Sequence, residues 1–347
     1  MFEYVGVIHV HSEFSDGTGK VDEISKIADD VGLDFLILTD HNTLRALNEG
    51  YEKRYGNTLL LVGVELNDSE NKNHYLAMGI NRPFSTRMKA TEYVRKVKEA
   101  GGIGFIAHPH EKRNKMPQHP PFPWTAWDSE DFTGIEIWNH MSEWMEGLTE
   151  ENKYYRVRHP LRSITSPTPE TLAKWDEIAM ERSITGIGGV DAHAHKVNVL
   201  GLIEVEIFPY KVLFKSIRTH ILLDEPLEKD NSKYGIEKAK KQIYLALEKG
   251  NCFVTNFYHG DAKGFRFFAE TPKGNFRQGN TIDFSDEITL NALLPAEAEV
   301  KLIRNGKVVA HEKTASFVFP VKENGIYRIE AYKGKYGWIF SNHIRIV

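Results

Sequence analysis

The stretch Val7–Asp16 reads V-I-H-V-H-S-E-F-S-D, and the rest of the chain can be understood from it. Val7, Ile8 and Val10 are β-branched and predict a short buried strand, from which His9 and His11 would project on the same side. Neutral imidazole is a common protein ligand for divalent metals, and a strand is a stiff platform for it. For this stretch alone, a pair of partly exposed strand histidines would be the favoured interpretation. The recurrence of the same arrangement further along the chain favours a metal site.

Length and charge limit the class of protein. The 347 residues, 41% of them hydrophobic, are enough for one large domain and one small one, and we expect two domains. Lys and Arg total 44 against 48 Asp and Glu, a formal net charge of -4. No overall basic field therefore favours long nucleic acid as a partner.

The sequence also carries no pattern typical of export or membrane insertion. The single cysteine, Cys252, excludes an internal disulfide and a multi-cysteine zinc site, which fits a reducing compartment. Met1 leads into the first strand without a signal-peptide pattern, and no apolar stretch approaches the roughly 20 residues that span a bilayer. We expect a soluble cytoplasmic protein without membrane contact.

Apolar runs alternate with segments of helical spacing. The spacing predicts helices over 21–31, 85–100, 168–182 and 232–249, and apolar runs predict strands over 33–38, 59–64, 103–107, 134–138, 184–190 and 252–256. Residues 109–130 hold five prolines without a period and predict a long loop over the active face, whereas 196–231 are poorly patterned. This alternation indicates parallel βα units in a barrel or an open doubly wound sheet.

Ligand-type side chains follow the apolar runs. Because the carboxyl ends of parallel strands meet at one face, we expect these side chains to gather there, as barrel enzymes hold their sites. His74 precedes the run 75–79, and a hairpin with the strand ending at Glu65 would return it to the same rim. The residues that follow apolar runs are Asp40, His41, Glu65, His108, Asp191 and His193.

From about residue 264 the composition changes to short alternating runs separated by turns. Asn305-Gly306 between two such runs is a strong hairpin signal. We predict a metallohydrolase barrel over 1–262 and a small antiparallel Ig-like β-sandwich over 263–347. The sandwich contains His311 and His343 but no clustered ligand set, so packing or binding of an unknown protein partner is its expected use.

Together these motifs resemble the PHP (polymerase and histidinol phosphatase) superfamily. The resemblance implies a distorted seven-stranded (β/α) barrel that holds two or three divalent ions. The tail G-W-I-F-S-N-H-I at 337–344 resembles a bacterial two-domain branch that includes carbaryl-hydrolase-type metallohydrolases. The matching motifs are H-x-H at 9 and 11, S-D-G at 15–17, T-D-H at 39–41, Glu65, His74, A-H-P at 107–109 and D-A-H at 191–193.

The family pattern, carried over position by position, implies three metal sites. The first would use His9, His11, Glu65 and Asp191; the second Glu65, His74 and His108; and the third Asp16, His41 and His193. Mixed imidazole and carboxylate ligands suit Zn, Mn or Fe. Asp40 would orient an imidazole of the T-D-H turn, since ligating histidines usually donate their other N–H to such a group.

The expected reaction is hydrolysis of a phosphoester of a small molecule, with a nucleotide as one candidate. A water bridging two cations loses a proton near neutral pH and supplies the nucleophile. We expect Glu65, Asp191 and His193 to be catalytic together with His110, which would protonate a leaving group or hydrogen-bond a ligand. The expected substrate contacts are Arg113, Glu136, His140 and His195.

Each substrate contact has a competing interpretation. Lys112, Arg113 and Lys115 in the long loop would receive a second phosphate or a carboxylate, or form a solvated charged loop. Glu136 would contact substrate or act as a buried structural carboxylate.

Two other functions compete with the phosphoesterase. The same cluster could hydrolyse a carbamate, ester or amide, or the chain could be a non-catalytic metal-stabilised scaffold. The filled ligand positions weigh against the scaffold. A polymerase-associated proofreading role has little support, because no polymerase follows the barrel and the net charge is negative.

Overall fold

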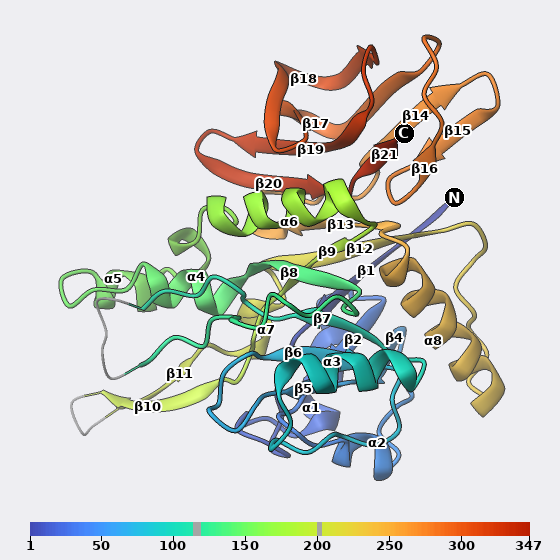
Figure 1. The fold of residues 1–347 in the computed structure, drawn as a ribbon. Helices are drawn as coiled ribbons and strands as arrows, with labels where there is room; N and C mark the ends of the chain where they lie inside the picture. The colour runs from blue at the N-terminus through green and yellow to red at the C-terminus, as the bar shows by residue number, and fades with distance from the viewer. Residues whose placement is uncertain (114–118, 200–202) are drawn as a thin grey trace.

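The computed structural model describes residues 1–113, 119–199 and 203–347; Lys115 lies outside the described residues. The N-terminal strands form two neighbouring sheets (Figure 1). One contains β1 (Phe2–Ile8), β2 (Phe35–Leu38), β3 (Arg54–Tyr55), β4 (Thr58–Val62), β12 (Ile217–Leu223) and β13 (Cys252–Asn256). The other runs in the order β5 (Val64–Leu66), β6 (Tyr75–Met78), β7 (Ile103–Ile106), β8 (Gly134–Asn139) and β9 (Thr185–Gly189).

The continuous apolar runs form strands that are covered on both faces. Every residue of β2 (F-L-I-L) and of β4 (T-L-L-L-V) is buried, and β1, β2 and β4 pair in parallel. This is the pattern expected of parallel strands with helices on the outside. The predicted hairpin is also confirmed, because β5 and β6 pair antiparallel with Glu65 opposite Leu76.

Both edges of the five-stranded sheet meet the larger sheet. Only Gly63 separates β4 from β5, and after β9 the backbone N–H of Val190 donates to the carbonyl of Ile8 at the end of β1 (3.1 Å). The mixed α/β class is therefore confirmed. The closed seven-stranded barrel stays a prediction, since the described strands fall into separate sheets.

The helices lie outside these sheets. All four predicted helices are present, although α3 begins at Ala90, five residues after the predicted start, and the other four described helices were not predicted. Thr168 accepts a hydrogen bond from the backbone N–H of Thr171 at the start of α6, with Pro169 in the first turn, and Ser232 caps α8 in the same way. None of the described helices combines the length and apolarity needed to cross a membrane. The helices are α1 (Val21–Asp30), α2 (Arg45–Asn48), α3 (Ala90–Glu99), α4 (His140–Glu146), α5 (Lys153–Arg158), α6 (Pro169–Glu181), α7 (Tyr210–Leu213) and α8 (Lys233–Glu248).

The poorly patterned region 196–231 contains regular structure that the sequence did not reveal. It holds α7, the buried strand β12 and most of a separate two-stranded ribbon of β10 (His195–Val199) and β11 (Ile203–Ile207). The predicted loop 109–130, by contrast, has no helix or strand among its described residues.

The C-terminal strands stack on the N-terminal sheets and join them (Figure 1). Strand β20 pairs antiparallel with β13, so one sheet runs from the first part of the chain into the second. Asn305 (φ 49°) and Gly306 (φ 76°) form the predicted tight hairpin turn. The boundary at residue 262 and the Ig-like sandwich stay predictions. The C-terminal strands are β14 (Arg266–Thr271), β15 (Gly274–Arg277), β16 (Thr281–Ile282), β17 (Thr289–Arg304), β18 (Lys307–Pro320), β19 (Gly325–Lys333), β20 (Tyr336–Ser341) and β21 (Ile344–Ile346).

Candidate metal centre

The structure brings all nine predicted ligand side chains together. Each has an imidazole nitrogen or a carboxylate oxygen within 3.7 Å of another member of the cluster. They come from loops after β1, β2, β7 and β9, from β5 and from the residue before β6, and they are His9, His11, Asp16, His41, Glu65, His74, His108, Asp191 and His193.

Glu65 lies at the centre of this cluster. Its Oε2 is 3.0 Å from His9 Nε2 and 3.1 Å from His11 Nε2. Its Oε1 is 2.7 Å from His74 Nδ1 and 3.4 Å from His108 Nε2. The two oxygens of one buried carboxylate therefore face two different pairs of imidazoles, which is the geometry that a bridging ligand requires.

The other ligands form two further groups around Glu65. Asp191 Oδ1 lies 3.3 Å from the Nε2 atoms of both His9 and His11, which completes the first predicted set. Asp16 lies 3.6 Å from His41 and 3.2 Å from His193, which is the third set. His41 Nδ1 is also 3.4 Å from Glu65, so this histidine lies between the second and third sets rather than in the third alone.

One direct observation indicates that these side chains suit divalent cations. Both ring nitrogens of His11 and Nε2 of His74 are buried without a hydrogen-bond partner. Buried polar atoms are normally satisfied, and a nitrogen lone pair left over among carboxylates is satisfied by a cation. Because the donors are imidazoles and carboxylates without thiolates, the cluster suits open sites for Zn, Mn or Fe rather than a closed structural zinc site.

The electrostatics of the cluster lead to the same conclusion. Burial acts to lower the pKa of His11, but the carboxylates of Asp191 and Glu65 outweigh it and raise that pKa to about 9. Burial also opposes ionisation of Glu65, yet the surrounding histidines hold its pKa well below the usual range. The carboxylates thus remain ionised and must be balanced by cations, either protons on imidazoles or metal ions.

Three of these residues have a left-handed backbone conformation, which is unfavourable for non-glycine residues and persists because the surrounding structure holds it. The strand expected to carry His9 and His11 ends at Ile8, and His9 has φ 67°, so that part of the prediction is wrong. His108 (φ 27°) and Asp191 (φ 53°) turn in the same way directly after or near a strand end. Such conformations cost of order 1–3 kcal/mol for non-glycine residues and cluster at functional sites. Here they turn the side chains inward.

Glu136 is buried and bonded to a ligand loop, as the structural alternative of the sequence interpretation expects. Its side chain is buried, with Oε1 2.8 Å from His9 Nδ1 and Oε2 accepting from the backbone N–H of His108 and from Asn139 Nδ2 (both 2.9 Å). A carboxylate in this position fixes the tautomer and orientation of a ligating imidazole. The buried alternative in the sequence interpretation is therefore the correct one.

Asp40 does not orient an imidazole. It accepts hydrogen bonds from the backbone N–H and the hydroxyl of Ser12 and from the Ser15 hydroxyl, all at 2.7 Å. Asp40 therefore holds the loop that carries His11 and Asp16. Glu136 has the role that was predicted for Asp40.

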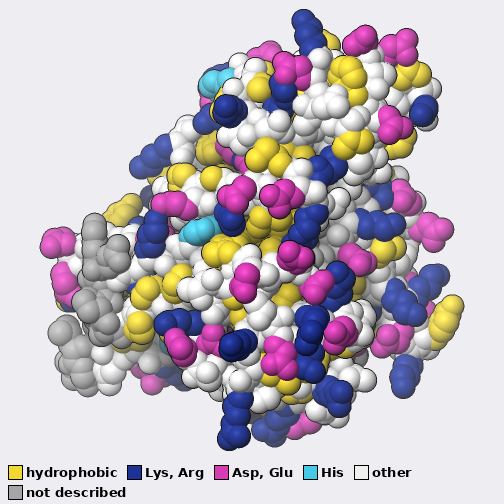
Figure 2. All heavy atoms as spheres, in the orientation of Figure 1, with side chains coloured by type: hydrophobic (Ala, Val, Ile, Leu, Met, Phe, Trp, Pro, Cys, Tyr) yellow, Lys and Arg dark blue, Asp and Glu magenta, His cyan; other side chains and the backbone are white. Residues whose placement is uncertain are grey.

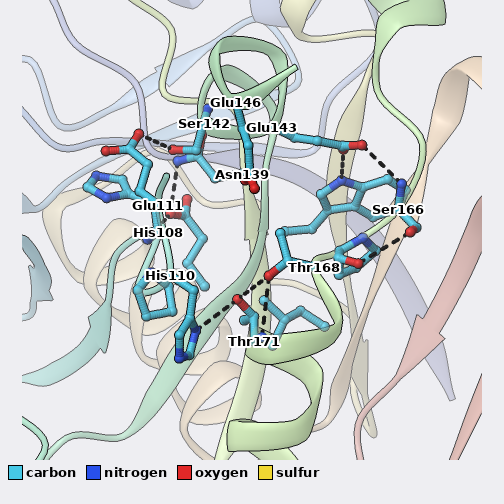
Figure 3. Close-up of a pocket in the computed structure, with 15 residues that line it drawn as sticks. His108, His110, Glu111, Asn139, Ser142, Glu143, Glu146, Ser166, Thr168 and Thr171 are labelled. Atoms are coloured by element: carbon cyan, nitrogen blue, oxygen red, sulfur yellow. Dashed lines mark hydrogen bonds between the residues drawn. The ribbon is translucent and has the colours of Figure 1, made fainter. Parts of the chain in front are cut away.

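His110 lies apart from the cluster, in a small neighbouring pocket between the loop after β7 and the start of α6 (Figure 3). Its Nδ1 is 3.1 Å from the Thr171 hydroxyl, and its ring stacks on Trp127. A second and larger cavity, called the main cavity below, has the metal cluster as its floor. His108 lines both the small pocket and the main cavity, whereas His110 lines only the small pocket. The predicted catalytic role of His110 has no support in this geometry.

The other predicted substrate contacts divide into two kinds. His195 and Arg113 line the main cavity, and Arg113 pairs with Glu111 there. His140 does not line the cavity; it is fully buried, both ring nitrogens lack a partner, and burial lowers its pKa to about 3. Lys112 pairs with Glu170 on α6 instead of facing the cavity.

The cluster forms the floor of a cavity of about 870 Å³. Its walls come from the loop 109–130, α4, α5 and the ribbon of β10 and β11. Most of these wall residues are apolar, including Met141, Trp144, Met145, Leu148, Val157, Val197, Val205 and Ile207. A cavity of this size matches the roughly 300–1,000 Å³ of small-molecule sites.

Two functional features escaped the sequence interpretation. The Tyr210 hydroxyl lies 2.8 Å from the carbonyl of His11 and 3.1 Å from that of His193, so α7 ties two ligand loops together. No local pattern marks Tyr210, because its partners are distant in the sequence. The ribbon did carry a signal, since H-K-V-N-V and I-E-V-E-I both alternate with period two.

Comparison with known proteins finds similarity for part of the chain. Residues 8–118 match the family model of the PHP domain. An uncharacterized protein of Methanocaldococcus jannaschii is 27% identical over 146 residues, covering 38% of this chain and 80% of that protein.

Two solved structures are similar at low identity. A two-domain protein of Bacteroides vulgatus containing a predicted PHP-like metal-dependent phosphoesterase is 15% identical, with 99% of this chain and 95% of that chain covered and a TM-score of 0.46. A proposed metal-dependent phosphoesterase of Bifidobacterium adolescentis is 17% identical, with coverages of 57% and 91% and a TM-score of 0.35. The family match over residues 8–118 agrees with the resemblance seen in the motifs.

Proposed function

We propose that this chain is a metal-dependent phosphoesterase that hydrolyses a small phosphorylated molecule with two or three bound Zn, Mn or Fe ions. The observation that carries this proposal is the buried carboxylate of Glu65 between two pairs of imidazoles. The PHP match over residues 8–118 supports a metal-dependent hydrolase. We further infer that the two N-terminal sheets act as a barrel-like scaffold with the site at its rim.

The residues divide the work of hydrolysis between them. When bound, the cations would lower the pKa of a water molecule and polarise the phosphoryl oxygens. The oxygen of water then forms a bond to phosphorus, the bond to the leaving alcohol breaks, and the alcohol takes up a proton. Glu65, His9, His11 and Asp191 would hold the first cation, while Glu136 keeps His9 in one orientation.

A second candidate function is hydrolysis of a carboxylic ester or carbamate. It is favoured by the apolar cavity wall and by Arg113, whose charge is already paired with Glu111 instead of being free for a phosphate. Both reactions use the same floor, so only substrates can separate them.

The test uses p-nitrophenyl esters that share one leaving group. The purified chain is stripped with a chelator, reloaded with Mn, Zn or Fe, and assayed on p-nitrophenyl phosphate, bis-p-nitrophenyl phosphate, p-nitrophenyl acetate and a p-nitrophenyl carbamate. We expect turnover of a phosphate. Turnover of the acetate or carbamate alone would replace phosphoesterase by the second candidate, and no turnover with metal fully loaded would overturn both.

A matched pair of variants links the activity to the cluster. Glu65→Gln is expected to weaken metal affinity. The loss should exceed the roughly 10–100-fold that is typical when a residue hydrogen-bonded to a metal ligand is replaced. Glu312→Gln, on the exposed part of β18, makes the same chemical change outside the cluster and is expected to keep metal and activity. Elemental analysis beside the assay separates loss of metal from loss of chemistry.

A further inference from the structure

We propose that the substrate is an ester whose organic part is a bulky apolar group, held by the wall of the main cavity. This inference rests on the proposed hydrolase function for the floor of the cavity. It concerns the wall, whose residues belong to neither the metal cluster nor its supporting hydrogen bonds. Three separate elements present apolar side chains to the same space.

Helix α4 supplies the first part of the wall. Met141, Trp144, Met145 and Leu148 line the cavity at positions i, i+3, i+4 and i+7. This spacing places Met141, Trp144 and Met145 on one face of α4, and Leu148 follows two residues after the helix ends. The face looks toward the cavity floor, where the metal cluster lies.

The ribbon of β10 and β11 supplies the second part. The register pairs His195 with Ile207 and Val197 with Val205, and all four side chains line the cavity. Of the intervening residues, Lys196 pairs with Glu204 (3.1 Å) away from the cavity, whereas Asn198 also lines the cavity. Val197, Val205 and Ile207 of the ribbon therefore turn an apolar surface toward the cavity. Only two strands form this ribbon (Figure 1).

Helix α5 and the long loop complete the wall. Tyr154, Val157 and Arg158 follow one another at helical spacing along the cavity, and the exposed Arg158 places a cation at its rim. On the floor side the ring of Phe122 stacks on His74, with centroids 5.0 Å apart. An apolar surface thus continues from the rim to a predicted metal ligand.

Such a surface is costly to expose without a function. The described face of the molecule in Figure 2 shows Lys and Arg interspersed with Asp and Glu, which is the ordinary surface of a globular protein. Apolar side chains from α4, α5 and the ribbon instead converge on a cavity. Trp144 and Leu148 are otherwise packed in the core, whereas Tyr154 and Val197 are exposed where they line the cavity. The group that fills this cavity must also reach the metal cluster on the floor. This condition favours the organic part of a substrate, and not a docked protein, as the occupant.

Binding of n-alkylphosphonates tests this inference without turnover. They are analogues of alkyl phosphates that cannot be hydrolysed, and calorimetry with metal-loaded protein gives their affinities from ethyl to octyl. We expect affinity to rise by up to about fourfold per methylene until the cavity is filled. Affinity that is independent of chain length would overturn the inference.

Turnover of n-alkyl phosphates separates the inference from the proposed function. The leaving alcohols have similar acidity, so kcat/KM along the series reports binding of the chain. We expect kcat/KM to rise with chain length. Turnover that does not depend on chain length would overturn the inference of an apolar substrate and leave the hydrolase function standing. Phosphonate binding that depends on chain length, without turnover of any ester, would overturn the hydrolase function and leave the apolar site standing.

A pair of variants locates the binding. Val205→Asp places a charge on the apolar face of the ribbon, and Val309→Asp makes the same change at an exposed position of β18. Val205→Asp is expected to abolish the chain-length dependence of phosphonate affinity, and Val309→Asp is expected to leave that dependence unchanged. A dimer in light scattering that Val205→Asp converts to monomer would assign the wall to a second copy and overturn the inference.

Discussion

Glu136 illustrates at the level of one residue how the candidate site is held. Its carboxylate accepts hydrogen bonds from three groups, and one of them is the ring nitrogen of His9 that faces away from the cluster. Replacing it by Gln puts an amide N–H₂ opposite these donors and leaves a buried polar atom without a partner.

We therefore expect Glu136→Gln to weaken metal affinity by roughly 10–100-fold. Metal titration of stripped protein measures this. Because Glu136 does not touch the cavity wall, KM at saturating metal should stay within about twofold of the unsubstituted protein. A large rise in KM with metal affinity unchanged would restore Glu136 as a substrate contact.

The burial of His140 predicts that the free energy of unfolding depends on pH. It is fully buried against Phe208 without a hydrogen-bond partner, and burial lowers its pKa to about 3. Since this pKa lies below the unfolded value of about 6.5, the unfolded chain binds the proton first as pH falls. The stability that neutral His140 contributes is present above about pH 6.5 and is lost progressively toward pH 3.

The measurement is the free energy of unfolding from urea titrations between pH 7.5 and 5. We expect His140→Phe, which keeps an aromatic ring of similar size, to show a shallower loss of stability with falling pH than the unsubstituted protein. His311→Phe at an exposed position of β18 is the matched control and should leave the slope unchanged. Equal slopes in all three proteins would contradict the assignment.

At the level of elements, α6 is bound to the C-terminal strands through charge. Asp176 of α6 accepts hydrogen bonds from Arg328 of β19 at 2.7 and 2.8 Å, and His343 Nε2 lies 2.7 Å from the same carboxylate. Burial would raise the pKa of Asp176, but Arg328 and His343 hold it well below its usual range. The pair is almost completely excluded from solvent.

Removing one partner leaves a buried charge uncompensated, so Arg328→Leu should lower the free energy of unfolding by about 3–5 kcal/mol. The double variant Asp176→Leu/Arg328→Leu should recover part of this loss. The exposed pair Arg45–Glu49 provides the comparison, and Arg45→Leu should cost less than about 0.5 kcal/mol. Equal effects at both pairs would contradict a structural role for the α6 contact.

At the level of the whole molecule, the C-terminal strands complete the N-terminal sheet. Strand β20 covers one edge of β13, and the Asn342 side chain bonds to the backbone of Gly186 and Cys252. Without β20, one edge of β13 would be exposed, and an exposed strand edge is a template for aggregation.

We expect a chain ending at residue 262 to aggregate in size-exclusion chromatography, and the full chain to unfold in one calorimetric transition. A soluble, cooperatively folded fragment 1–262 would instead support two independent domains with the predicted boundary.

Local patterns in the sequence predicted the mixed α/β class and most of the ligand-type residues of the cluster, whereas Asp16 and the division into three sets came from the PHP resemblance. Buried parallel strands need continuous apolar runs, and ligand-type residues after such runs stand out against the pattern, as Asp191 and His193 do after β9. The amphipathic ribbon was missed, although Val197 and Val205 alternate with charged or polar residues, because each strand is short and lies next to unpatterned sequence.

By itself, then, the sequence determined which residue types can bind metal and which segments are buried, because both depend on side-chain chemistry and on periods of two to four residues. Only the tertiary structure decided which partner each side chain meets. Glu136 supports His9 across 127 positions of the chain, while His110, two residues after a ligand, turns to Thr171. Such contacts depend on how sheets and loops pack, because the packing and not the spacing along the chain sets the distance between two side chains.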